Sequence, residues 1–182
     1  MRFTPLSLAG AYRVELEKRG DDRGFFARMF CENEFAQHGL ATRWVQVNSS
    51  YSAAKGTLRG LHFQRPPSAE AKLVRCLRGA IFDVIVDLRA GSATYGRHET
   101  LHLDDEKRAM VYIPPGFAHG FQTLTDDVEL LYFHSAAYDP RHEGGLHHAD
   151  GRLAIAWPLP PEQLSERDQG FPFLTDLEPI EL

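Results

Sequence analysis

Four charged or imidazole side chains stand inside two stretches that otherwise have the composition of β-strands. Arg59 and His62 lie in TLRGLHFQ (57–64), and Lys72 and Arg75 lie in AKLVRCL (71–77). Such groups are costly to bury unless they are paired or chemically used. An imidazole suits proton abstraction near neutral pH, and a guanidinium suits the oxygen atoms of phosphate. Together they predict a functional site in which proton transfer and anion binding are the available chemistry.

Alternation along the strands predicts which of these side chains point the same way. In a regular strand, His62 and Gln64 share one face while Arg59 points to the other. Gly60 lies between Arg59 and His62, and glycine often hosts a bulge that reorients a strand. We therefore predict a bulge at Gly60 that reorients Arg59. The simpler alternative is that His62 is a hydrogen-bonded core residue and Lys72 a solvated edge residue.

A second cluster, IPPGFAHGF (113–121), predicts a turn followed by a strand that carries His119. Its P-x-G-x-x-H order is half of the cupin metal signature. The other half needs two histidines and a glutamate, but the sequence reads His62-Phe63-Gln64, and the next acidic residue, Glu70, lies in a loop. This donor set falls short of a catalytic metal site, so no metal is expected. A metal-dependent cupin oxygenase or isomerase that uses His62 and His119 stays open as an alternative.

The elements that must position these residues are mostly strands. Short β-branched or aromatic runs bounded by turn residues predict an all-β sandwich or barrel. In AIFDVIVDL (80–88), Phe82 and Val84 alternate with Asp83 and Ile85, the period of a strand. Gly79 predicts a hairpin between 71–77 and 80–88. The other expected strands are 11–17, 24–30, 42–52, 57–64, 97–103, 109–115 and 128–134, and helices are expected only within 31–40 and 160–169.

Length and composition bound the class of protein. The 182 residues fit a single domain (1–182), and a net charge of −5 argues against binding to nucleic acid. Cys31 and Cys76 are isolated, which fits a reduced setting rather than a disulfide framework. The N-terminal residues do not read as a signal peptide, and no run is apolar enough to span a membrane. We expect a cytoplasmic protein without a membrane partner.

Three segments in one order resemble the dTDP-4-dehydrorhamnose 3,5-epimerases. They are LRGLHFQRPPSAEAKLVRCLRGAIFDVIVDLR (58–89), IPPGFAHGFQTL (113–124) and SERDQGFP (165–172), and the resemblance extends from about Arg23 to Phe173. It implies a cupin-like jelly-roll β-sandwich that works as a homodimer without metal or cofactor. Its substrate would be a nucleotide-linked 4-keto-6-deoxy sugar on the route to L-rhamnose and related deoxysugars.

The resemblance also assigns the catalytic residues. A ketone at carbon 4 acidifies the protons on carbons 3 and 5, so inversion needs a base, an opposed acid and a cation at the enolate oxygen. By resemblance, His62 is the base and Asp168 the carboxylate that fixes its tautomer. Tyr132 matches the acid on the opposite side of the sugar, and Lys72 matches the cation near the carbonyl oxygen.

Substrate-binding residues follow from the same resemblance. Two arginines would grip the diphosphate, two amides would add polar contacts, and three rings would line the sugar and nucleotide pockets. In that order, these residues are Arg23 and Arg59, Gln46 and Asn48, and His119, Tyr138 and Phe26.

The sequence departs from the family pattern at four positions. Arg28, at the nucleotide end, replaces a usual glutamate, Phe133 replaces a lysine, and His147-His148 replaces an Arg-Trp pair. A guanidinium in place of a carboxylate exchanges hydrogen-bond acceptors for donors, so the preferred nucleotide (dTDP, GDP or CDP) stays open. A single-site 3- or 5-epimerase, a ketoisomerase and a non-catalytic sugar-nucleotide binding module remain alternatives.

Overall fold

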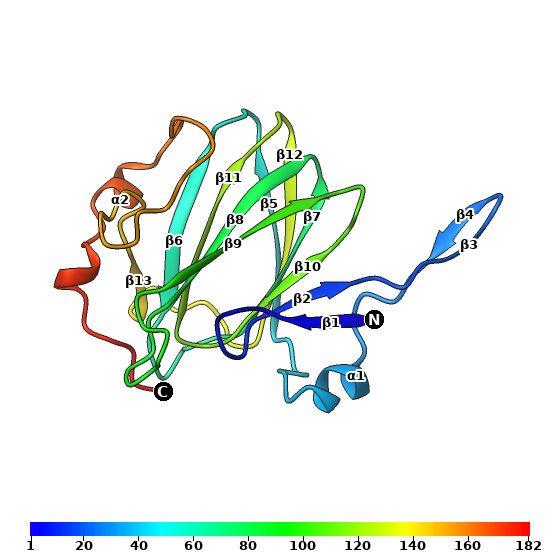
Figure 1. The fold of residues 1–182 in the computed structure, drawn as a ribbon, viewed down its shortest axis with the longest axis horizontal. Coiled ribbons are helices and arrows are strands. Elements are labelled where there is room, and N and C mark those ends of the chain that lie inside the picture. Colours follow the sequence, from blue (N-terminus) through cyan, green and yellow to red (C-terminus); the bar gives the residue numbers. More distant parts are fainter.

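Two antiparallel sheets lie face to face in the computed structural model, which describes residues 1–182 (Figure 1). The six-stranded sheet has the order β1 (Arg2–Pro5), β2 (Tyr12–Glu15), β10 (Met110–Ile113), β7 (Lys72–Arg78), β12 (Val128–His134) and β5 (Gln46–Ser52). The five-stranded sheet has the order β13 (Glu143–Gly145), β6 (Leu58–Gln64), β11 (Phe117–Thr123), β8 (Ala80–Asp87) and β9 (His98–Asp104). The arrangement confirms the predicted all-β sandwich.

Apolar layers bury both faces of the five-stranded sheet. Between the sheets, Val74 of β7 and Leu130 of β12 pack with Ile85 of β8. The opposite face of β8, with Val84 and Val86, is covered by the C-terminal segment. The predicted alternation of β8 is therefore correct, and both of its faces are buried because each meets a different layer.

Short helices pack on the outside of the sandwich, as expected. Helix α1 (Glu32–Gln37) buries Phe35 against Leu73 and Met110 on the outer face of the six-stranded sheet. Helix α2 (Glu166–Gln169) is shorter than the helix expected within 160–169, because it begins only after Ser165, whose side chain accepts a hydrogen bond from the backbone N–H of Asp168. The 3-10 helix η1 (Leu174–Asp176) follows. None of the helices is long and apolar enough to cross a membrane.

The prediction of a hairpin at Gly79 is wrong. Strands β7 and β8 belong to different sheets, so Gly79 connects the two layers instead of pairing neighbouring strands. Its φ of +77° and the 2.5 Å between an added Cβ and Oγ1 of Thr125 leave room only for glycine. A glycine between two strand-like runs signals a sharp change of direction, but the sequence does not say into which sheet the chain turns.

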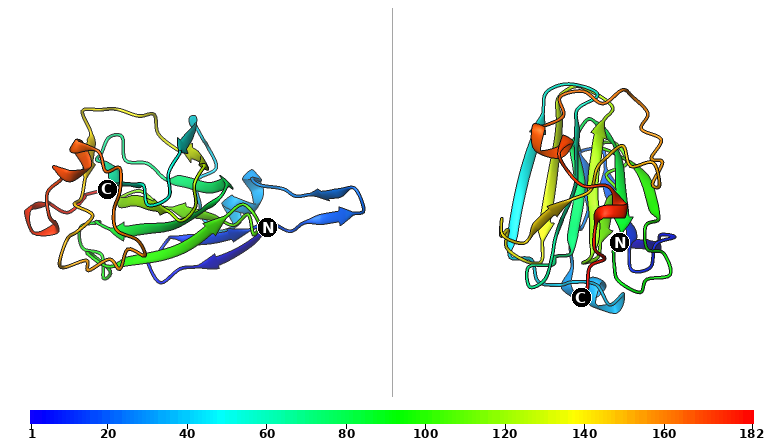
Figure 2. Two further views of the ribbon diagram at one scale, coloured as in Figure 1. Left: turned by 90° about the horizontal axis from the view of Figure 1, so that it is seen from above. Right: turned by 90° about the vertical axis from the view of Figure 1, so that its left-hand side faces the viewer.

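Strands β3 (Arg19–Asp21) and β4 (Gly24–Phe26) form a two-stranded hairpin that projects from the sandwich (Figures 1 and 2). We call this hairpin the arm. Strand β4 begins where expected but ends before residue 30, because regular pairing stops at Phe26. The strand expected over 42–52 begins only at Gln46, since Trp44 packs its ring against Phe35 of α1 instead.

Candidate active site

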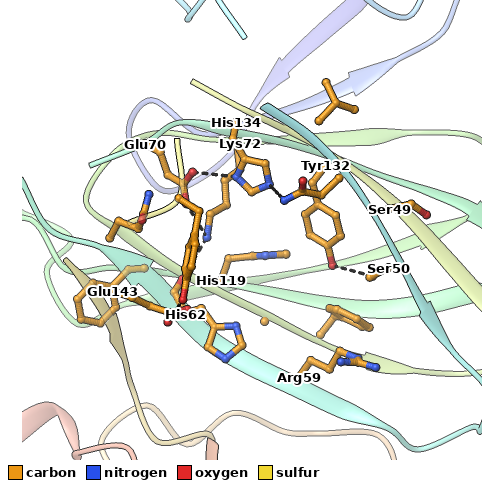
Figure 3. Close-up of a pocket in the computed structure, with 17 residues that line it drawn as sticks. Ser49, Ser50, Arg59, His62, Glu70, Lys72, His119, Tyr132, His134 and Glu143 are labelled. Carbon is orange, nitrogen blue, oxygen red and sulfur yellow. Dashed lines mark hydrogen bonds and ion pairs between the residues drawn. The ribbon is translucent and has the colours of Figure 1, made fainter. Parts of the chain in front are cut away.

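A cavity of about 570 Å³ opens between the two sheets. Its volume falls in the range of sites that bind small organic molecules. Figure 3 shows His62 and Arg59 from β6 facing Lys72, Tyr132 and His134 from β7 and β12 across the cavity. The remaining residues that line it are Val47, Asn48, Ser49, Ser50, Phe63, Gln64, Glu70, His119, Gly120, Phe121, Tyr138 and Glu143.

A bulge in β6 brings Arg59 and His62 to the same side. His62 pairs with His119, and Arg59 pairs with Phe121, so three steps along β6 match two along β11. Gly60 in this bulge has a φ of +115°, and an added Cβ would lie 2.6 Å from Cα of Gly120. Only glycine fits both constraints. The predicted bulge at Gly60 is confirmed.

His62 is held from behind by Asp168. Nε2 of His62 lies 2.8 Å from Oδ1 of Asp168, whose other oxygen accepts the backbone N–H of Gly60 at 3.0 Å. Burial alone would raise the pKa of Asp168, but these hydrogen bonds outweigh it and hold the pKa below its ordinary value. The carboxylate therefore stays ionised and fixes the proton of neutral His62 on Nε2, which leaves Nδ1 as the basic nitrogen.

Tyr132 lies on the opposite sheet with its phenol group inside the cavity. Burial raises the pKa of Tyr132 above its ordinary value, so the phenol keeps its proton at neutral pH. Its hydroxyl lies 3.5 Å from Oγ of Ser50, and its ring meets that of His119 edge-on with centroids 6.2 Å apart. His119 is itself fixed by Asp83, with 2.7 Å between Nε2 and Oδ2. The site thus opposes a proton acceptor and a proton donor.

Lys72 supplies a positive charge to the wall that carries Tyr132. Its side chain is buried, and Nζ lies 3.4 Å from Oε1 of Glu70 and 3.4 Å from the carbonyl oxygen of His62. Nδ1 of His134 lies 2.8 Å from Oε2 of Glu70. The sequence analysis did not assign Glu70 or His134 to the site, although His134 shares the strand parity of Tyr132.

Four of the residues assigned to substrate binding meet at the cavity. Arg59, Asn48, His119 and Tyr138 line it directly. Gln46 lies behind them, donating to Oδ1 of Asn48 at 3.2 Å and accepting the backbone N–H of Tyr138 at 3.1 Å. The structure therefore brings both predicted amides and two of the three predicted rings, His119 and Tyr138, together with the predicted acid and base.

The three residues near the arm do not reach this cavity within one chain. Arg23 binds Asp21 at the tip of the arm, and the side chain of Phe26 is 76% exposed. Arg28 forms an ion pair with Glu34 at 2.7 Å. Their separation from the cavity could not be predicted, because the sequence does not reveal that β3 and β4 leave the sandwich.

No group of three or more His, Cys, Asp or Glu side chains is arranged to hold a metal ion. His62 and His119, which the alternative metal site would use, each have a carboxylate partner of their own. The rings of His147 and His148 stack on each other with centroids 4.6 Å apart, and His147 also meets Phe173. The histidine pair is thus part of the packing around the C-terminal segment.

Comparison with known proteins gives one consistent family. The family model described as dTDP-4-dehydrorhamnose 3,5-epimerase matches residues 5–176. The chain is 44% identical to a dTDP-4-dehydrorhamnose 3,5-epimerase of Sinorhizobium fredii over 97% of this chain and 91% of the relative. It is 45% identical to a dTDP-4-dehydrorhamnose 3-epimerase of Streptomyces niveus over 93% of this chain and 82% of the relative.

Solved structures agree with the sequence comparison. A 4-keto-6-deoxy sugar epimerase from the novobiocin gene cluster of Streptomyces spheroides superposes with a TM-score of 0.91 at 44% identity, covering 96% of this chain and 88% of that one. A dTDP-6-deoxy-D-glucose-3,5-epimerase of Legionella pneumophila, in complex with dTDP-4-keto-L-rhamnose, gives 0.91 at 37% identity, covering 97% and 94%. The fold thus has counterparts among solved structures of sugar-nucleotide epimerases.

Proposed function

The chain belongs to the dTDP-4-dehydrorhamnose 3,5-epimerase family, and from this membership we propose how it inverts carbon centres of dTDP-4-keto-6-deoxyglucose. His62 removes a proton from one face of the sugar, and Tyr132 returns a proton to the other. The observation that carries this assignment is the placement of the two side chains on opposite sheets, facing one cavity (Figure 3).

The base is His62, supported by Asp168. When Nδ1 of His62 takes a proton from carbon 3 or 5, the C–H electron pair becomes part of an enolate. The imidazole then carries a positive charge 2.8 Å from the buried carboxylate, which stabilises it. This ion pair lowers the barrier because it exists only after the proton has moved.

The acid is Tyr132, and Lys72 serves the enolate. Negative charge develops on the oxygen at carbon 4, where the ammonium of Lys72 stabilises it. The raised pKa of Tyr132 keeps the phenol protonated until the carbanion forms. Proton return from the face opposite His62 inverts the carbon. The imidazolium of His62 then releases its proton to solvent, and the tyrosinate takes one up from solvent, so both groups return to their starting states.

The diphosphate is held at the Arg59 end of the cavity. The guanidinium of Arg59 donates to Oγ of Ser52 at 3.1 Å and to the carbonyl oxygen of Tyr51 at 3.2 Å. These bonds orient the fork while leaving donors for phosphate oxygen atoms. No carboxylate lies within ion-pair distance of Arg59, so its charge is available to the substrate.

A homodimer accounts for the residues on the arm. Three large apolar side chains are more exposed than such side chains usually are: Phe26 on the arm, and Val47 and Tyr51 on the edge strand β5. We propose that the arm of one protomer lies against the cavity of its partner and supplies Arg23 and Phe26 there, with Arg28 near the nucleotide. In a two-fold dimer both cavities are completed in the same way.

The dimer is tested by sedimentation equilibrium and by mixing. His62→Ala and Arg23→Ala variants are each expected to be inactive or weak, and a mixture to regain activity through dimers that hold one intact site. A monomer, or a mixture without recovery, contradicts the shared site.

A 3-epimerase is the second candidate, because the Streptomyces niveus relative with that name is 45% identical to this chain. Proton NMR in D2O with dTDP-4-keto-6-deoxyglucose distinguishes the two by following the signals at carbons 3 and 5. Loss of both supports the 3,5-epimerase, and loss of one supports the single-site enzyme. No exchange with the dTDP, GDP or CDP sugar contradicts the proposed function.

Two further observations support the proposed domain organisation and cellular location. The family match over residues 5–176 supports one domain over 1–182. Cys31 and Cys76 are both free thiols, which supports a location in the reducing cytoplasm. A disulfide found in protein isolated from its native host would contradict that location.

A further inference from the structure

Glu70 and His134 line the cavity without a role in the chemistry described above. We propose that they are positioning residues for the epimerisation, which hold the ammonium of Lys72 at the carbonyl oxygen of the sugar. The inference rests on the proposed function, since it assigns these residues to the same reaction.

The three groups form one buried cluster. The carboxylate of Glu70 divides its two oxygens between Nζ of Lys72, at 3.4 Å, and Nδ1 of His134, at 2.8 Å. The side chains of Lys72, Glu70 and His134 are only 10%, 7% and 13% exposed. Glu70 is the one carboxylate within ion-pair distance of Lys72, so it is the charge that fixes the ammonium.

The contacts leave one donor of Lys72 free. An ammonium group has three N–H donors. One is used in the hydrogen bond to the carbonyl oxygen of His62 at 3.4 Å, and the ion pair with Oε1 of Glu70, also at 3.4 Å, draws a second toward the carboxylate. The third remains for the oxygen at carbon 4 of the sugar, where the enolate charge develops. Holding two donors in place therefore aims the third.

His134 keeps Glu70 from neutralising Lys72 completely. Its Nδ1–H takes one carboxylate oxygen, so only the other oxygen faces the ammonium. Without His134, both oxygens of Glu70 would be available to Lys72, and its nitrogen would be drawn toward the carboxylate. The pair thus sets both the position of the lysine and the share of its charge that the substrate meets.

A chain of hydrogen bonds with consistent direction extends this cluster to the predicted binding amides. Because Nδ1 of His134 donates to Glu70, its Nε2 can accept from the amide nitrogen of Asn48, 3.4 Å away. Oδ1 of Asn48 accepts from Gln46 at 3.2 Å, and Gln46 accepts the backbone N–H of Tyr138 at 3.1 Å. His134 therefore links the predicted binding amides on β5, Gln46 and Asn48, to Lys72 on β7.

The test compares substitutions that keep or remove the bond to Glu70. Asparagine at position 134 places its amide N–H near the place of Nδ1, whereas leucine has no donor. We expect His134→Leu and Glu70→Gln to lower kcat for exchange in D2O by about 10- to 100-fold with KM within about twofold, because misplacing a catalytic group by about 1 Å can cost about 100-fold. His134→Asn should retain most of the kcat that His134→Leu loses.

A double-substitution cycle separates positioning from a general structural role. If Glu70 acts through Lys72, then Glu70→Gln should change kcat little once Lys72→Met has removed the ammonium. Equal effects in both backgrounds would overturn the proposal. So would an equal loss in His134→Asn and His134→Leu, because the imidazole would then be needed for its own proton chemistry.

The matched control is His102 on β9, which also contacts a carboxylate, with 3.1 Å between its Nδ1 and Oδ2 of Asp104, but does not line the cavity. His102→Asn should leave kcat unchanged. Exchange by the wild-type protein separates the two levels of inference. Its absence contradicts the proposed function, whereas wild-type exchange with unaltered Glu70→Gln and His134→Leu variants contradicts only the positioning role.

Discussion

Replacing Asp168 by asparagine should leave the cavity intact and disable the base. Asp168 is 4% exposed and does not line the cavity, so the substitution removes no substrate contact. The amide oxygen of asparagine can still accept the N–H of Gly60, which directs its NH2 group at Nε2 of His62. Nε2 must then accept a hydrogen bond, and the proton of the imidazole moves to Nδ1. The nitrogen that should receive the proton of the sugar is thereby blocked.

The expected loss follows from the two effects together. A hydrogen bond between charged groups contributes about 2–3 kcal/mol, which alone corresponds to roughly a 30- to 150-fold fall in rate. A positioned general base contributes about 10²–10⁴-fold, and the wrong tautomer removes most of it. We therefore expect Asp168→Asn to lower kcat between about 10² and 10⁴-fold.

The assay is proton exchange at carbons 3 and 5 in D2O, with affinity for dTDP measured by calorimetry. Binding should change by less than about threefold, because Asp168 lies behind the base. Asp176→Asn, an exposed aspartate in the same C-terminal segment, is the matched control and should behave like the wild type. A kcat for Asp168→Asn within about threefold of wild type would refute the assignment of His62 and Asp168 as a pair.

Three further substitutions test the architecture around the site. Gly60→Ala should lower both the melting temperature and kcat, because its Cβ would lie 2.6 Å from Cα of Gly120 at a φ of +115°; thermal denaturation with wild-type values would show that the bulge tolerates a side chain. Arg59→Ala should weaken dTDP binding at least about tenfold in calorimetry, since charge-assisted bonds to phosphate are lost, and unchanged affinity would place the diphosphate elsewhere. Asp87→Asn should lower the free energy of unfolding by about 2 kcal/mol at pH 7. Although burial opposes ionisation of Asp87, hydrogen bonds from Arg89 and nearby hydroxyl groups lower its pKa from 3.8 to about 2. Because the folded-state pKa is depressed, this stabilisation is present above about pH 3.8 and disappears as the pH falls through 2; urea titrations that give equal stabilities at pH 7 would contradict it.

Local pattern predicted much of the fold and of the reacting centre. Alternation in β8 was readable because each face meets a different apolar layer. The bulge at Gly60 was predictable because Arg59 and His62 had the wrong parity to act together. The passage of the chain from one sheet to the other at Gly79 could not be predicted, because a glycine with positive φ occurs both in hairpins and where a chain changes sheet.

The missed residues depend on contacts between distant segments. Glu70 looked like a loop residue, and its meeting with His134 requires β7 and β12 to be neighbours. The spacing of residues in the sequence does not predict that these two strands pair. The position of Arg23 on a projecting arm depends on how β3 and β4 leave the sandwich, which only the assembled fold reveals.

Exchange and inversion measured together in Tyr132→Phe test the central claim, a base and an acid on opposite faces of one sugar. In D2O the wild-type protein should yield the inverted sugar with deuterium at each epimerised carbon. The phenylalanine variant retains His62, so it should still exchange protons for deuterons while returning them on the original face, giving washout without inversion. Inversion by the variant at the wild-type rate, or loss of washout together with inversion in a folded variant, would contradict the two-sided mechanism.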